Sequence, residues 1–155
     1  MSVKNADFTI VSGNIGHVID KKVIELYQAN DNELVIYSVR SMATNAKFRN
    51  NDEFMVAVAA SELATNILRY AGKGKMEINI IQKTDSNVVG IELLACDFGP
   101  GIADIDLAMK EQYSTTPNSL GQGLPTVKRI MDEFFIESIY GRGTRILARK
   151  WRINE

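Results

Sequence analysis

Apolar residues at helical spacing between positions 52 and 70 limit the possible folds more strongly than any other feature of the sequence. The core stripe has helical spacing and consists of Val56, Ala60, Leu63, Ile67 and Tyr70. The neighbouring stripe turns polar at Glu62 and Asn66, which lie four residues apart and therefore point in nearly the same direction. Gly72 and Gly74 are expected to end the helix. The stretch predicts a long packed helix that carries a carboxylate and a carboxamide beside its buried side.

The residues before and after this helix predict shorter elements. Strands are expected at 7–11 and 21–27, joined through the segment GNIGH. A second helix is expected to run from a cap at Asn30, supported by Glu33 three residues later, to about Ala46. Alternating apolar residues then predict a hairpin with strands around 76–80 and 89–95 and a TDSN turn.

The last third of the chain predicts a glycine-rich loop, a helix and a final hairpin. The loop covers roughly 97–123, and the helix begins at Leu124–Pro125, where a first turn tolerates proline. Its expected apolar positions are Val127, Ile130, Met131 and Phe134. Strands at 135–140 and 144–151 flank a GRG turn. Helices alternating with hairpins predict one α+β domain over 1–155, with helices on one face of a mixed, mainly antiparallel sheet.

Composition excludes several classes of function. The net charge of −1 gives no field that would attract nucleic acid or a membrane surface, so neither is expected as a partner. No apolar run is long enough to span a bilayer, and the first residues lack signal-peptide features, so we expect a soluble, cytoplasmic protein. Cys96 and His17 are single residues of their type, which argues against an internal disulfide and a His/Cys zinc site.

Glycine is concentrated in three segments. These are DFGPGI at 97–102, LGQGLP at 120–125 and GRGT at 141–144. Glycine lets a backbone approach a ligand closely, and free amides at a helix start attract phosphate. The first two segments therefore indicate a nucleotide site, whereas GRGT alone is typical of an ordinary turn.

Common nucleotide-binding motifs do not fit these segments. GKGK at 72–75 lacks the spaced glycine of a Walker loop, and GPGIAD lacks the third glycine of a dinucleotide fingerprint. DFG at 97–99 matches protein kinases, but the HRD loop, the VAIK lysine and the length for two lobes are missing. The DFG match is therefore accidental.

The order of the remaining motifs resembles a known superfamily. SELATNILRYAGKGK, DFGPGI and LGQGLPTVKRIMDEF resemble the N, G1 and G2 boxes of GHKL-type ATPases, a superfamily that includes histidine-kinase catalytic domains and anti-sigma-factor serine kinases. AGKGK, YSTT and GRGTRILARKW further resemble the switch serine/threonine kinases of bacterial stressosomes. The resemblance covers roughly 21–151 and leaves residues 1–20 as an N-terminal addition whose role the sequence does not indicate.

This resemblance implies a role for each polar residue of the long helix. Asn66 would supply its side-chain oxygen to Mg²⁺, which bridges the phosphates of ATP. Glu62 would lie near the γ-phosphate and act as the catalytic base for an incoming hydroxyl. Taken without the glycine segments, the two residues would favour a solvated helix face or an ordinary hydrogen bond over a nucleotide site.

The resemblance also assigns residues to the adenine and phosphate ends of ATP. Asp97 would accept a hydrogen bond from the adenine amino group, with Thr144 supporting it through water. A lid over about 104–123 would fold over the phosphates. The remaining expected cofactor contacts are Gly99 and Gly101 for base and ribose, and Gly121, Gly123 and Leu124 for phosphate. Two questions stay open: whether Ser114, Thr115 and Thr116 touch phosphate, and whether Arg69 faces the nucleotide, a protein substrate or solvent.

Three functions are compatible with these expectations. The first is an ATP-dependent protein serine/threonine kinase that phosphorylates STAS-domain scaffold or antagonist proteins and then binds another partner, such as a phosphatase. The second is a nucleotide-binding partner-switching module with little or no kinase activity. The third, a free-standing ATPase, would release phosphate steadily without an acceptor protein.

Overall fold

A computed structural model describes residues 8–9, 15–102, 105–110 and 123–153. In these ranges the elements follow the order β1 (Gly16–Leu26), α1 (Asp31–Asn45), α2 (Asn50–Tyr70), β2 (Gly74–Lys83), β3 (Val89–Asp97), α3 (Ile105–Ala108), α4 (Leu124–Ile130), β4 (Glu133–Ile139) and β5 (Gly143–Trp151). The strands form one sheet in the order β1-β2-β3-β5-β4, and each of these pairings is antiparallel. The predicted α+β fold is confirmed.

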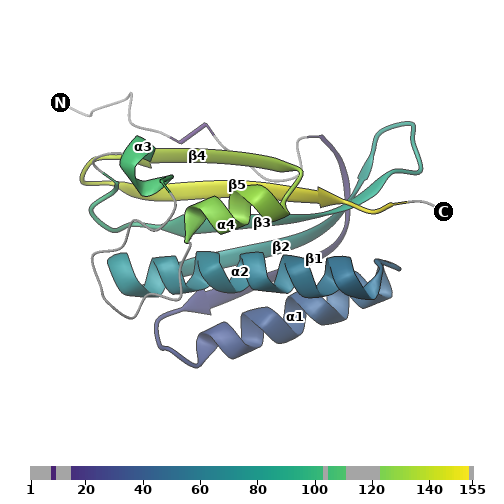
Figure 1. Ribbon diagram of the computed structural model, residues 1–155, viewed down its shortest axis with the longest axis horizontal. Coiled ribbons are helices and arrows are strands. Elements are labelled where there is room, and N and C mark those ends of the chain that lie inside the picture. The colour runs from purple at the N-terminus through teal and green to yellow at the C-terminus, as the bar shows by residue number, and fades with distance from the viewer. Residues whose placement is uncertain (1–7, 10–14, 103–104, 111–122, 154–155) are drawn as a thin grey trace.

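The helices α1, α2 and α4 cover one face of this sheet (Figure 1). The core between the two layers includes the alternating residues of the central strands, namely Met76, Ile78, Ile80, Ile91, Leu93 and Ala95. Helix α2 contributes Val56, Ala60, Leu63 and Ile67. The predicted hairpin is therefore confirmed, and so is the core stripe at these four residues. None of the helices in the described ranges is both long and apolar enough to cross a membrane.

The end of α2 differs from the prediction at two residues. Tyr70 is 52% exposed and does not belong to the core, because α2 ends there and the chain turns away at Gly72, whose φ is +82°. Gly74 does not end the helix but begins β2, opposite Asp97 of β3. Helical periodicity alone does not show where the last turn leaves the core.

The N-terminal strand prediction is only partly right. The strand expected at 21–27 exists but begins earlier, at Gly16. Part of the N-terminal addition therefore pairs with β2 at the edge of the sheet, with a register shift between Val18 and Asp20. For the strand expected at 7–11, Phe8 and Thr9 belong to no regular element, and residues 7, 10 and 11 lie outside the described residues. Thr9 donates backbone and hydroxyl hydrogen bonds to Glu137 of β4.

The predicted cap of α1 is wrong in its chemistry. Asn30 precedes the helix but already has helical dihedrals and makes no side-chain cap bond, whereas a capping residue usually has an extended backbone. The Asp31 carboxylate instead accepts the backbone N–H groups of Tyr27 and Gln28 at 2.9 and 3.0 Å. The bond from Tyr27 is the main reason that the pKa of Asp31 is lowered.

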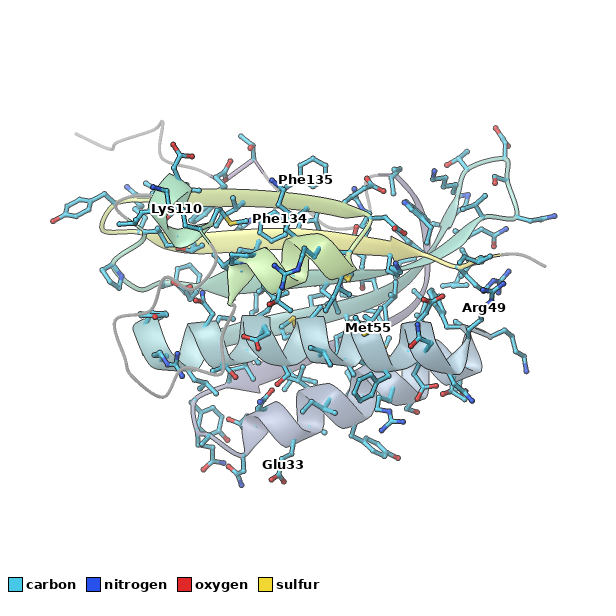
Figure 2. All side chains as sticks on the ribbon, viewed as in Figure 1. Glu33, Arg49, Met55, Lys110, Phe134 and Phe135 are labelled. Atoms are coloured by element: carbon cyan, nitrogen blue, oxygen red, sulfur yellow. The ribbon has the colours of Figure 1, made fainter. Side chains whose placement is uncertain are left out.

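Helix α4 is shorter than predicted. It ends at Ile130, because Met131 has an extended backbone and the N–H of Asp132 already bonds to Arg149 O of β5 at 2.8 Å. Phe134, predicted on this helix, lies on β4 beside Phe135 (Figure 2). Phe134 still packs against the core, because it pairs with the buried Ala148.

Candidate nucleotide site

Glu62 and Asn66 lie one turn apart at the border between the buried and exposed sides of α2. Both are half-buried, and the next residue in each case, Leu63 and Ile67, is fully packed in the core. Burial raises the pKa of Glu62, and the positive charge of Arg69 partly opposes this rise. The Arg69 charge therefore acts on the predicted base. A carboxylate with a raised pKa on a rigid helix is suited to accepting a proton.

The Asp97 carboxylate closes the end of β3 and is only 7% exposed. Its strand neighbours are Gly74 on one side and Thr144 on the other. Gly99 N donates to Asp97 Oδ1 at 2.9 Å. Burial raises the pKa of Asp97, while the amides of Gly99 and Thr144 act in the opposite direction. The side chain is thus held in one orientation in a largely buried setting, where a polar group needs a partner.

The glycines around Asp97 allow three segments to meet closely. A Cβ on Gly99 would lie 2.7 Å from Ala71 Cβ, and one on Gly74 would lie 2.7 Å from Ile67 Cγ2. Glycine is therefore required here for packing between the end of α2, the sheet and the loop after β3. The predicted role of Gly99, giving room to the adenine base, stays a prediction.

Ser138, which the sequence analysis missed, ties the loop after β3 to the last hairpin. Its hydroxyl lies 3.0 Å from Thr144 Oγ1 and accepts the N–H of Ile102 at 2.6 Å. Gly141 N also donates to Pro100 O at 2.9 Å. The sequence shows only a hydroxyl residue within the strand FIESIY. Its role depends on the pairing of Ser138 with Thr144, which the sequence does not reveal. The Thr144 hydroxyl thus supports the loop through Ser138.

Gly101 gives a test of this loop. It has a φ of +82°, and a Cβ there would lie 2.8 Å from Ile139 O, so Gly101→Ala meets both backbone strain and a clash. Gly72 has the same φ, and no atom of the described residues lies within 4 Å of a Cβ added there. We expect Gly72→Ala to lower the free energy of unfolding by about 1–2 kcal/mol, and Gly101→Ala to cost about 1–3 kcal/mol more, measured by urea denaturation. Equal losses in the two variants would contradict the close packing of the loop.

The phosphate end of the predicted site is only partly described. Gly121, the residues 114–116 and most of the predicted lid at 104–123 lie outside the described residues, although residues 105–108 of that segment form α3. Gly123 precedes α4 with a φ of +56°, and within the described part of the chain no atom lies within 4 Å of a Cβ added there. The Leu124 side chain is 4% exposed and packs in the core, so only its backbone remains available to a ligand.

The two predicted ends of the site lie on the same side of the molecule. Asn66 precedes Ile67, which contacts Gly74, and Gly74 pairs with Asp97. In the described ranges no group of three His, Cys, Asp or Glu residues is arranged to hold a metal ion. Mg²⁺ at Asn66 would accordingly take most of its ligands from phosphate and water, as this ion commonly does. The half-buried carboxamide oxygen of Asn66 fits that chemistry.

Comparison with protein families identifies the class that this fold and site define. Residues 29–150 match the model described as "Histidine kinase-like ATPase domain". The chain belongs to this family, which confirms the resemblance predicted from the sequence motifs.

Individual relatives place the chain more closely. It is 46% identical to the serine/threonine-protein kinase RsbT of Bacillus subtilis over 112 residues, which are 72% of this chain and 82% of RsbT. It is 32% identical over 99 residues to the anti-sigma F factors of Clostridium kluyveri (61% of this chain, 68% of the relative) and Clostridium acetobutylicum (61% and 67%). The catalytic domain of histidine kinase ThkA has a TM-score of 0.49 at 14% identity, covering 84% of this chain and 96% of that one. This last likeness is too distant to add to the family assignment.

Proposed function

We propose that the protein is an ATP-dependent protein serine/threonine kinase that acts in the cytoplasm. The 46% identity to a serine/threonine-protein kinase over most of both chains is the observation that carries this proposal. In it, Asp97 would accept a hydrogen bond from the adenine of ATP, and the Asn66 carboxamide oxygen would hold Mg²⁺ beside the phosphates. The bound metal would neutralise phosphate charge. The protein supplies the Glu62 carboxylate, which takes the proton of the acceptor hydroxyl. Phosphoryl transfer depends mainly on positioning and charge stabilisation, so a small domain suffices when a partner brings the acceptor.

The acceptor in this proposal is a serine or threonine of a STAS-domain scaffold or antagonist protein. After transfer, the kinase leaves the phosphorylated scaffold and binds a second partner, such as a phosphatase. The relatives named as anti-sigma F factors support an exchange of protein partners within this branch of the family.

Asn66→Ala tests the nucleotide site. A hydrogen bond to a charged group is worth about 1.5–3 kcal/mol, so we expect a loss of about 10- to 100-fold in affinity for ATP with Mg²⁺. Calorimetric titration would measure it. Asn51→Ala, which removes the same side chain from an exposed position of the same helix, should bind ATP like the wild type. Unchanged affinity in Asn66→Ala would contradict the assignment of Asn66.

A partner-switching module with little kinase activity is the second candidate, favoured by the same anti-sigma F relatives. The two candidates separate when the wild type is incubated with labelled ATP, Mg²⁺ and a purified STAS protein. Label on the STAS protein supports the kinase, whereas stable binding without label supports the module. Steady phosphate release without any acceptor would instead indicate a free-standing ATPase.

A further inference from the structure

A basic groove lies at the end of the molecule that carries the β2–β3 hairpin and the start of α2. It is open to solvent and encloses about 690 Å³. Its lining consists of Lys47, Arg49, Gln82, Asn87, Val89, Arg152 and Ile153. Among the residues that the structure describes, the lining thus holds three cationic side chains, two carboxamides and two apolar side chains, and no carboxylate. Such a concentration of one sign is unexpected in a chain whose net charge is −1.

The groove has fixed walls because backbone bonds hold the segments that form it. Phe48, between the two cations of the α1–α2 connection, is 6% exposed, and its N–H bonds to Ala43 O at 3.0 Å. Arg152 N donates to Val89 O at 2.7 Å, and Arg152 Nη1 donates to Ala46 O at 2.9 Å. Three segments far apart in the sequence are therefore joined at this end before any ligand binds.

Several neighbouring features strengthen the positive potential of the groove. Lys47 and Arg49 are exposed, and α2 starts directly after Arg49 without a side-chain cap (Figure 2). A helix start carries partial positive charge and attracts anions. Of the two acidic residues in the first turn, Glu53 is already bound by Arg40 and by Thr44. Asp52, the other acid of that turn, is not among the described lining residues, so the positive potential of the described lining favours a negatively charged ligand.

This groove is separate from the nucleotide site. Strand β3 runs from Val89 in the groove to Asp97, a distance of about 26 Å at the usual rise of a strand. Glu62 lies about 18 Å along α2 from its first residue. Both distances exceed the Debye length of about 8 Å at physiological salt. The basic groove consequently does not serve the phosphates of the predicted ATP.

We propose that the basic groove docks an acidic peptide segment of a protein partner. Arginine and lysine bind carboxylates well, arginine in a bidentate manner. The Asn87 carboxamide suits the peptide backbone of such a segment, whereas Gln82 Nε2 already donates to Ser86 O at 2.8 Å. Ile153, which is 52% exposed, supplies an apolar contact beside the cations, and the buried Val89 forms the floor of the groove. A partner held there would stay bound whether or not nucleotide occupies the other end, which goes beyond the proposed kinase activity.

The test measures binding of a fluorescein-labelled hexa-aspartate peptide to the full chain by fluorescence anisotropy at low salt. Lys47→Glu and Arg49→Glu are each expected to weaken binding at least tenfold, and wild-type binding should weaken steeply with added salt. Lys22→Glu is the matched control, since it changes the net charge equally at an exposed position of β1 outside the groove lining. Arg49→Glu places an acid at a helix start, which favours folding.

The outcomes are distinct from those of the kinase tests. Equal affinity for the peptide in the groove variants and in Lys22→Glu would overturn the proposal. The proposal would also be overturned if inorganic polyphosphate bound to the groove and the aspartate peptide did not. Calorimetry with ATP and Mg²⁺ gives the independent readout, because all three variants should bind nucleotide like the wild type. If they do, and the peptide does not bind, the result rejects the docking role of the groove and does not affect the proposed kinase site.

Discussion

Glu62→Gln is expected to lower phosphate transfer to a STAS-domain acceptor by about 100- to 10,000-fold, the usual contribution of general-base catalysis. Glutamine keeps the shape of the side chain but cannot accept a proton, so affinity for ATP with Mg²⁺ should change little. Initial rates of labelling at saturating ATP measure the effect. Glu25→Gln, at an exposed position of β1, should leave the rate unchanged. Undiminished labelling in Glu62→Gln would reject Glu62 as the base.

The pH dependence of transfer gives a second readout of Glu62. A base must be deprotonated to act, and burial raises the pKa of Glu62 above its ordinary 4.5. Wild-type transfer should therefore fall as the pH is lowered, with a midpoint above 4.5. In Glu62→Gln the residual rate should lack this acidic limb. The same limb in both proteins would assign the titration to another group.

Much of the fold follows from local patterns in the sequence. The spacing of Val56, Ala60, Leu63 and Ile67 determined the core side of α2, and alternation at 76–80 and 89–95 determined the central hairpin. Because Glu62 and Asn66 lie on one helix, predicting that helix also predicts that their side chains lie one turn apart on the same side. The three glycine and helix motifs also predicted the family, because their order can be read along the chain without knowing which residues are in contact.

The features that sequence analysis missed depend on contacts between distant segments. Ser138 matters only because β4 and β5 pair in the register that places it opposite Thr144. Gly74 belongs to the site because the pairing of β2 with β3 brings it against Asp97. The predicted cap bond of α1 is absent for a similar reason, since Asn30 has helical dihedrals and the side-chain bonds at this helix start run from Asp31 to the preceding turn.

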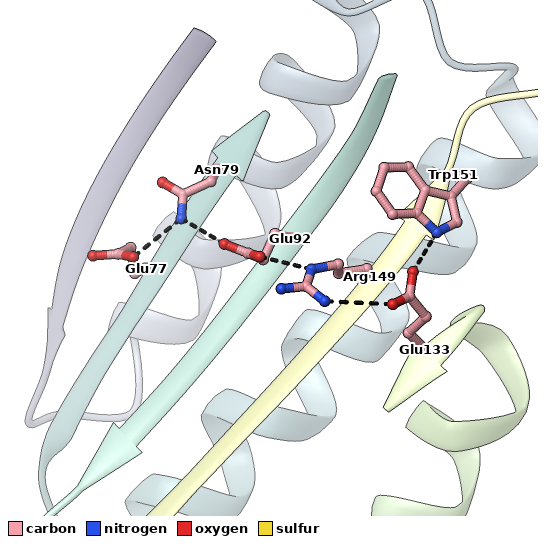
Figure 3. A network of polar contacts seen from close by, with 6 residues as sticks. All are labelled: Glu77, Asn79, Glu92, Glu133, Arg149 and Trp151. Atoms are coloured by element: carbon pink, nitrogen blue, oxygen red, sulfur yellow. Dashed lines mark hydrogen bonds and ion pairs between the residues drawn. The ribbon is translucent and has the colours of Figure 1, made fainter. Parts of the chain in front are cut away.

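Register also creates a row of polar contacts on the sheet face opposite the helices (Figure 3). Glu92 and Arg149 pair across β3 and β5, with Glu92 Oε2 accepting from Arg149 Nε at 2.8 Å and both side chains almost fully buried. Glu92 Oε1 accepts from Asn79 Nδ2 at 3.1 Å. Arg149 Nη1 lies 3.4 Å from Glu133, which also accepts the indole N–H of Trp151. Four of the five strands thus meet through this chain of contacts.

Arg149→Met is expected to lower the free energy of unfolding by about 3–5 kcal/mol, because it leaves Glu92 buried without its ion-pair partner. Urea denaturation measures the loss, and Arg142→Met in the exposed β4–β5 turn should cost little. The double variant Arg149→Met/Glu92→Leu separates charge from packing, since an apolar pair of similar volume commonly replaces a buried ion pair without loss. Recovery of most of the stability in the double variant would show that the ion pair adds little net stability over an apolar pair of similar volume. A loss below about 1 kcal/mol in the single variant would mean that water reaches Glu92 and that the pair is not desolvated.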